Sequence, residues 1–349
     1  MSESSSPPGQ PGLPQSPEPA KPASILPVRI AIDEPTRRLW IGGAMGVIYG
    51  IILQLLVRTS LLRPYFELMS VGLVFLMPMA IGFLVVYLAA LEKQRSIPFA
   101  LTAPVPTILT CLAVALAVGW EGGFCLLFAT PVFLVMAALG GLLALGVARL
   151  TGRGRAAAPL AAIVLLLPLT SGFVESGIRA QDAQHHVHTM IPIRASADKV
   201  WSEIIRVRPI TEPTSGFFYK IGFPKPIEAT LSHPGVGGVR NASFQKGLLF
   251  IETVDEWVPE KRISFSIKPD AHQTRLDPHV VVGGQYFDVL RGTYEVERLP
   301  NGEGVILHLW SHFRVSTHFN AYAGFLGTTL MRDIQDSILR VIQQRCEAP

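Results

Sequence analysis

The run LWIGGAMGVIYGIILQLLV, residues 39–57, contains no Asp, Glu, Lys or Arg and decides the class of the N-terminal half. A helix needs about 20 apolar residues to cross the hydrocarbon core of a bilayer. Four further charge-free runs follow it, at 68–91, 104–120, 122–148 and 156–174. Since backbone polar groups in lipid must be satisfied within their own segment, we expect about five transmembrane helices rather than one large buried core.

Small residues in the first run predict how it packs. Its glycines, Gly42, Gly43, Gly46 and Gly50, lie largely on one helical face, where they allow close helix contacts in lipid. The segment before the run has the opposite character, with nine prolines in its first 35 residues. Such a composition cannot bury a core, so residues 1–38 are expected to be a disordered, Pro-rich cytoplasmic tail.

Basic residues are distributed in a way that excludes nucleic-acid binding and predicts the orientation. The net charge is +4, yet from Asp182 onward 18 Lys and Arg balance 18 Asp and Glu, so the excess lies beside the apolar runs. Nine Lys and Arg fall on one side of a five-span arrangement and three on the other. By the positive-inside rule, the N-terminus is cytoplasmic and the C-terminal domain is extracytoplasmic. The nine are Lys21, Arg29, Arg37, Arg38, Lys93, Arg95, Arg149, Arg153 and Arg155, and the three are Arg58, Arg63 and Arg179.

The C-terminal half has a different pattern. After a membrane domain at 39–174 and a linker at 175–184, residues 185–349 alternate short strand-like segments with turn residues. Asn301-Gly302 predicts a hairpin, and residues 318–345 carry an apolar stripe every three or four positions. A helix of that length needs a broad apolar surface, which a curved antiparallel sheet supplies. The expected class is therefore a multi-pass α-helical membrane domain followed by an α+β domain.

Three fragments carry a resemblance to a known superfamily: IPIRASADKVW at 191–201, GVGGVR at 235–240 and GTYEV at 292–296. Together with the order of elements, they resemble the START-like, or SRPBCC, superfamily, the helix-grip group that includes polyketide cyclase/dehydrase-like and lipid-transfer proteins. The resemblance covers roughly residues 185–346. It implies a curved sheet gripping the long C-terminal helix, with an elongated apolar cavity that binds a hydrophobic small molecule or lipid.

Aromatic residues of this half are the candidates for lining such a cavity, because ligand pockets are mostly apolar. Core packing is the alternative at each position, since the face on which a strand residue lies cannot be fixed while bulges are unknown. Arg240 and Arg314 are candidates for steering an anionic headgroup, against ordinary surface placement. The aromatic candidates are Phe217, Tyr219, Phe250, Phe265, Phe287, Tyr294, Trp310, Tyr322 and Phe325.

Candidates for chemistry are few. His308, His312 and Asp288 could act as acid or base, and His308 and His312 share one strand face. There is no GxSxG, no CxxC and no metal-ligand spacing, and Gly235–Gly238 precedes a strand rather than a helix. We therefore expect no metal and no cofactor.

The leading hypothesis is a membrane-anchored START-like domain that binds a lipid or other hydrophobic molecule at the surface of a bacterial inner membrane. Binding is favoured over catalysis, because no nucleophile motif is present. Two alternatives remain open: a cyclase- or hydrolase-like enzyme on a hydrophobic substrate, and a regulatory domain that binds another protein. The identity of any protein partner cannot be read from the sequence.

Overall fold

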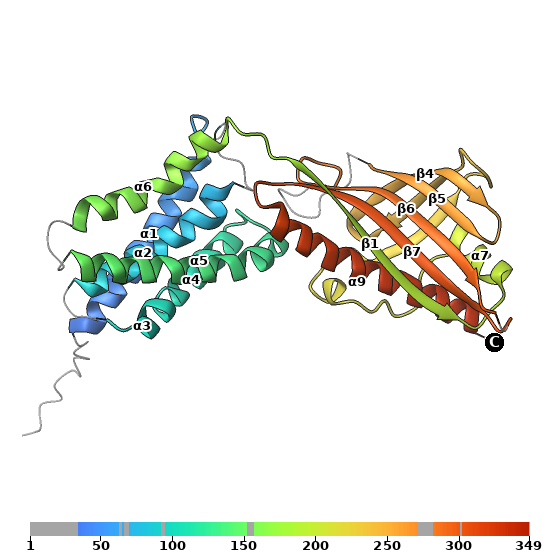
Figure 1. The fold of residues 1–349 in the computed structure, drawn as a ribbon, viewed down its shortest axis with the longest axis horizontal. Coiled ribbons are helices and arrows are strands. Elements are labelled where there is room, and N and C mark those ends of the chain that lie inside the picture. The colour runs from blue at the N-terminus through green and yellow to red at the C-terminus, as the bar shows by residue number, and fades with distance from the viewer. Residues whose placement is uncertain are drawn as a thin grey trace, which may run out of the picture.

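The computed structural model describes residues 34–62, 65, 70–91, 95–151, 157–270, 282–300 and 302–348. Most of the expected N-terminal tail lies outside these residues. In the described part, five helical segments are long and apolar enough to cross a membrane. They form a bundle beside the C-terminal domain (Figure 1). The helices are α1 (Glu34–Val57), η2 (Gly72–Leu76) continuing into α2 (Met77–Ala90), α3 (Ile97–Thr102), α4 (Val105–Ala117), α5 (Gly123–Leu150) and α6 (Ala157–Glu175).

Two boundaries differ from the charge-free runs for identifiable reasons. α1 begins at Glu34, inside the segment expected to be tail, because Pro35 suits the first helical position and arginine does not end a helix. The third segment begins at Ile97 and is divided between Thr102 and Val105. Pro104 and Pro106 lack the N–H groups that a continuous helix would use there.

Glycines bring the bundle helices into close contact. On α1, a side chain at Gly46 would meet Thr107 and Val85, so the glycine face expected from the sequence packs on α2 and α4. The closest approach is between α2 and α5, where a Cβ at Gly140 would overlap the carbonyl oxygen of Met79. Backbones can approach so closely only where no side chain intervenes.

The C-terminal half contains a seven-stranded antiparallel sheet in the order β1-β7-β6-β5-β4-β3-β2. β6 and β7 form a hairpin around Gly302, as the Asn-Gly pair predicts, and bulges interrupt β4 and β6. The strands are β1 (Asp182–Ile193), β2 (Pro226–Leu231), β3 (Val239–Phe244), β4 (Leu249–Val258), β5 (Arg262–Pro269), β6 (Phe287–Arg298) and β7 (Val305–Ser316). The remaining elements are α7 (Ala197–Ile205), α8 (Phe217–Lys220), η3 (Gln245–Gly247) and the long α9 (Asn320–Glu347).

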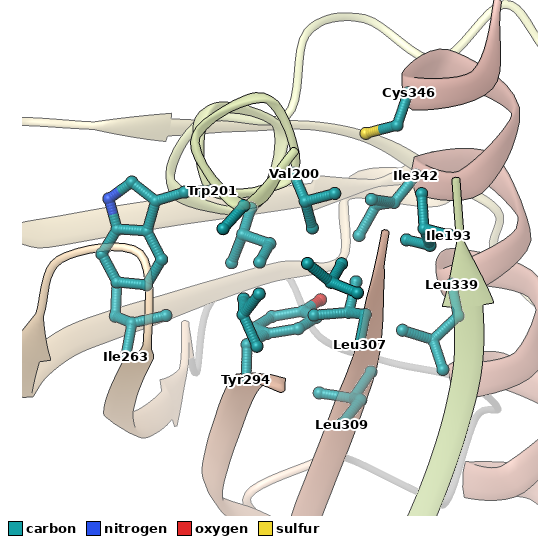
Figure 2. Close-up of a cluster of buried hydrophobic side chains, with 14 of the residues drawn as sticks. Ile193, Val200, Trp201, Ile263, Tyr294, Leu307, Leu309, Leu339, Ile342 and Cys346 are labelled. Atoms are coloured by element: carbon teal, nitrogen blue, oxygen red, sulfur yellow. The ribbon is translucent and has the colours of Figure 1, made fainter. Parts of the chain in front are cut away.

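α9 lies along the inner face of the sheet and runs from the bundle to the far end of the domain (Figure 1). At that far end, α7 and the last turns of α9 close on the sheet through a cluster of buried side chains (Figure 2). Val200 and Leu307 are fully buried there, and Trp201 is 7% exposed. Burying each such side chain stabilises the fold by roughly 1.5–3 kcal/mol, so this cluster fixes α9 against the sheet.

The two halves meet through aromatic contacts. Phe75 of η2 packs edge-on against Phe319, with ring centroids 5.4 Å apart. The hydroxyl of Tyr322 on α9 donates to the carbonyl oxygen of Phe128 on α5, at 2.6 Å. Phe124 stacks with Phe218 of α8 at 6.4 Å. The first turns of α5 and of α9 are thus in direct contact.

Candidate functional site

A cavity of about 130 Å³ lies between α9 and the inner face of the sheet, beside the closed end of the domain. Leu309 and Tyr294, which Figure 2 labels in the buried cluster, also line the cavity, so the cavity begins where that packing ends. Its walls are mostly apolar, and the charged residues among those that line it are Glu228, Arg240 and Glu252. The apolar lining residues are Val207, Ile210, Phe223, Pro226, Ala229, Ala242, Phe244, Phe250, Phe265, Ile267, Val282, Phe287, Val289, Gly292, Leu309, Leu330, Met331, Ile334 and Ile338.

One ion pair is buried in this wall. Arg240 of β3 and Glu252 of β4 are cross-strand partners, and their side chains form a salt bridge while only 4% and 6% exposed. Burial raises the pKa of Glu252, against the lowering effect of Arg240. Burial alone would lower the pKa of Arg240, but the adjacent Glu252 and Tyr294 raise it, so the guanidinium stays charged.

The Arg240 guanidinium is only partly satisfied. It lies over the ring of Phe265 at 5.3 Å from the centroid, and its Nη1 donates to Glu252. Its Nε is buried and has no hydrogen-bond partner among the described residues. Beside it, burial raises the pKa of the Tyr294 hydroxyl to about 12. The site therefore offers a ligand oxygen two kinds of hydrogen-bond donor within an apolar wall, the charged guanidinium of Arg240 and the neutral hydroxyl of Tyr294.

A second polar group of the wall, the side-chain amide of Gln335, is hydrogen-bonded to other residues of the protein. Gln335 of α9 is 1% exposed, and its Nε2 donates to Ser311 Oγ at 2.7 Å. Its Oε1 accepts from the Thr189 hydroxyl at 3.1 Å. Because both ends of the amide are bonded to β1 and β7, Gln335 ties the helix to the sheet.

The structure brings together four of the nine aromatic candidates. Phe250, Phe265, Phe287 and Tyr294 line the cavity. They lie on three different strands, at positions that alternate with residues of the outer face. Arg240, one of the two arginines expected to steer a headgroup, also lines the cavity as half of the buried pair.

The other five aromatic candidates lie elsewhere. Phe217 is 57% exposed and Phe325 is 66% exposed, while Tyr219 is buried against Phe223 outside the cavity wall. Trp310 points to the outer face, because its neighbours Leu309 and Ser311 take the inner positions of β7. Tyr322 is at the contact with the bundle.

The candidate acid and base residues lie outside the cavity lining. His308 Nδ1 is 3.0 Å from His188 Nε2, and His308 Nε2 is 3.0 Å from Glu297 Oε2. His312 is opposite His186 on the outer face of the same strand pair. Asp288 is opposite Arg314, also on that face, and burial raises its pKa. These side chains do not converge on a ligand in the cavity.

Arg314 is held by other groups of the protein. It binds Asp182, Ser316 and the carbonyl oxygens of Gly284 and Gln285. Within the described ranges, no cluster of three or more His, Cys, Asp or Glu side chains could hold a metal ion.

Glu252 is a residue of the candidate site that the sequence patterns did not single out. The signal was present: Phe250, Glu252 and Val254 alternate on one strand, so the carboxylate shares its face with two apolar side chains. A charge in such a position needs a partner, and Arg240 on the preceding strand supplies it.

Comparisons with family models and with curated proteins give no match. Solved structures that resemble the chain include SRPBCC-like proteins. A protein from Nitrosospira multiformis has 15% identity and a TM-score of 0.30, with 47% of this chain and 97% of that chain covered. The di-domain ARO/CYC protein BexL from the BE-7585A biosynthetic pathway has 14% identity and a TM-score of 0.30, covering 56% of this chain and 59% of its own.

Norcoclaurine synthase from Thalictrum flavum has 15% identity and a TM-score of 0.29, covering 46% of this chain and 95% of the synthase. At these values the likeness carries no functional information. The description of the C-terminal half as a sheet around a helix rests on the strand order and on the position of α9 (Figure 1).

Proposed function

We propose that the C-terminal domain binds a hydrophobic small molecule or lipid in the cavity beneath α9, while the helical half spans a bilayer and holds the domain at its surface. The observation that carries the proposal is the cavity itself, with apolar walls and one buried ion pair. Apolar cavities with a few polar groups are the usual form of a ligand site.

The charges of the wall favour a ligand whose buried end is uncharged. Arg240 and Glu252 neutralise one another, so a further full charge beside them would lack a partner in a medium of low dielectric. The third charged lining residue, the half-buried Glu228, would repel an anion. The buried Nε of Arg240 can donate to a carbonyl, ester or hydroxyl oxygen. A long apolar body with one such oxygen therefore matches the site better than a free anion does.

The surface of the helical half supports its placement in a bilayer. Large apolar side chains point outward along the helices, among them Trp40 at 70% exposed, Val135 at 59% and Ile163 at 58%. In water such a surface would aggregate, whereas lipid tails solvate it. The ends of α1, α4 and α6 and the start of α5 lie on the side of the C-terminal domain, which is the side with few basic residues.

Native mass spectrometry of the full-length protein, extracted in mild detergent, tests the binding. We expect a bound lipid or other apolar molecule, and its loss in Ala242→Phe, which fills the cavity from β3. Asn241→Phe is the matched control, because the neighbouring residue is exposed on the opposite face of that strand. A wild-type protein that purifies empty and takes up no lipid would overturn the proposal.

A further inference from the structure

Two more cavities continue from the proposed ligand site toward the helices. The interface cavity, of about 160 Å³, lies between the C-terminal domain and the bundle, and the bundle cavity, of about 100 Å³, lies among α1, η2, α2, α4 and α5. Among the described residues, no charged side chain lines the interface cavity. It is lined by Val74, Cys125, Phe128, Ala129, Tyr286, Phe287, Val315, Thr317, Phe319, Tyr322, Ala323, Leu326, Gly327 and Leu330.

The three cavities share walls. Phe287 and Leu330 line both the ligand cavity and the interface cavity. Val74, Cys125 and Ala129 line both the interface cavity and the bundle cavity. Neighbouring cavities therefore border on the same side chains, and Leu330 and Phe287 stand between the ligand cavity and the interface cavity.

The length of α5 explains why an apolar cavity can exist outside the bundle. Its 28 residues extend about 42 Å, whereas a bilayer core is about 30 Å thick. If Arg149 marks the cytoplasmic boundary, the 20 residues before it reach back to Ala129, and the turns from Gly123 to Phe128 stand beyond the hydrocarbon core. Those turns contact α8 and α9.

The polar groups of the bundle cavity stand at the same end. Glu121 lines that cavity, and Arg58 Nη2 donates to its carboxylate at 2.8 Å and to the carbonyl oxygen of Trp120 at 3.1 Å. Tryptophan and paired charges are typical of the boundary between water and membrane. A row of mostly apolar cavities thus lies between this boundary and the ligand cavity.

The path is long enough for an acyl chain. Along α9, the distance from Tyr322 at the bundle to Ile338 in the ligand cavity is about 24 Å, at about 1.5 Å per residue. A lipid chain in one leaflet spans about half of the roughly 30 Å core. The row of cavities therefore exceeds the length of such a chain.

We propose that the interface cavity is the passage by which the acyl chain of a membrane lipid moves between the bilayer and the ligand cavity, with Leu330 and Phe287 as its inner gate. This inference rests on the proposed ligand site and adds the source and chemical class of the ligand. The chain would leave the lipid phase beside α5, pass Ala129 and Cys125, and enter beneath α9.

Photo-crosslinking of the full-length protein in nanodiscs tests the passage. The nanodiscs contain phosphatidylethanolamine, phosphatidylglycerol and a phosphatidylcholine with a diazirine in its acyl chain, and mass spectrometry maps the adducts. A second arm adds diazirine-labelled palmitic acid from the aqueous side. In the wild type we expect adducts from the bilayer probe on peptides that contain Phe250 or Ile338.

Two variants narrow the passage without changing the ligand cavity, Ala129→Phe on α5 and Ala323→Phe on α9. Each is expected to lower the cavity adducts from the bilayer probe about tenfold, while cavity adducts from palmitic acid persist. Their controls are Val135→Phe, at an exposed position of α5, and Ala321→Phe, on the exposed side of α9. Both controls should label like the wild type.

The outcomes separate the two proposals. Equal cavity labelling from the bilayer probe in the narrowed variants and in their controls would overturn the passage and leave the ligand site standing. Cavity adducts in the wild type from palmitic acid, but none from the bilayer probe, would also overturn the passage and leave the ligand site standing. Absence of cavity adducts from both probes in the wild type would overturn the ligand site itself.

Discussion

His188 Nε2 and His308 Nδ1 are 3.0 Å apart on the outer face of the sheet, and His188 is stacked on Trp310 with ring centroids 3.7 Å apart. One hydrogen bond joins the two imidazoles, so at least one of the facing nitrogens must be unprotonated. Burial, followed by repulsion from His308, lowers the pKa of His188 in the folded protein.

This relationship predicts an acid-sensitive domain. The pKa of a histidine in the unfolded chain is about 6.5. When the folded-state pKa is lower than this, the unfolded chain binds more protons below about pH 6.5, so the stability contributed by that histidine is complete above this pH and is lost as the pH falls. Burial also lowers the pKa of His312, with His186 and Arg291 adding to the effect. We expect the thermal midpoint of the domain, measured by tryptophan fluorescence, to be lower at pH 5 than at pH 7.5. The decrease should begin near the unfolded-state histidine pKa of about 6.5. In His188→Gln/His312→Gln the fall should be smaller; an equal fall would show that other groups are responsible.

The Arg240–Glu252 pair predicts a strong asymmetry between single and double substitutions. Glu252→Leu leaves a buried guanidinium without its carboxylate and should destabilise the domain by about 3–5 kcal/mol. Arg240→Met/Glu252→Leu removes both charges and should recover most of that loss. Urea unfolding measures the three proteins, and a double variant no more stable than the single one would mean that packing, rather than charge, sets the cost.

The α2–α5 contact predicts that one added methyl group disturbs the bundle. Gly140→Ala would push the new Cβ into the carbonyl oxygen of Met79, and overpacking of this kind costs about 1–3 kcal/mol. Gly146→Ala, on the same helix, meets no atom within 4 Å and should be neutral. Size-exclusion profiles after heating in detergent compare the two variants. Equal profiles would argue against tight α2–α5 packing.

The orientation can be tested with reporters. Alkaline phosphatase, which is active only outside the cytoplasm, should be active when fused after Pro349 and inactive when fused after Leu91. The reason is the nine-to-three distribution of Lys and Arg between the two sides. The reverse pattern would invert the topology, and activity at both positions would disprove the five-span arrangement.

Sequence patterns predicted the elements well wherever one physical effect dominates. A charge-free run such as 122–148 predicts a membrane helix because charged side chains are costly in lipid and are therefore kept out of the span. The observed α5 differs from that run by only one or two residues at each end. The apolar stripe of 318–345 predicted α9 for a similar reason. The periodicity of a long amphipathic helix survives small errors in its boundaries.

Site residues were harder to predict because the face of a strand changes with a single residue. On β7, the aromatic Trp310 was the conspicuous candidate, but the unremarkable Leu309 and Ser311 line the cavity. On β6, the bulge at Leu290 shifts the alternation, so that Phe287 and Gly292 both face inward. Neither the bulge nor the contact between Phe128 and Tyr322 leaves a local sequence signal.

The cluster around Trp201 and Ile342 gives the domain a closed base and sets it at the end farthest from the bundle (Figures 1 and 2). A soluble protein that approaches along the axis of α9 from the aqueous side meets this base first. On the proposed route, occupancy of the cavity then follows the lipids dissolved in the adjacent leaflet. The domain would report on the composition of its own membrane.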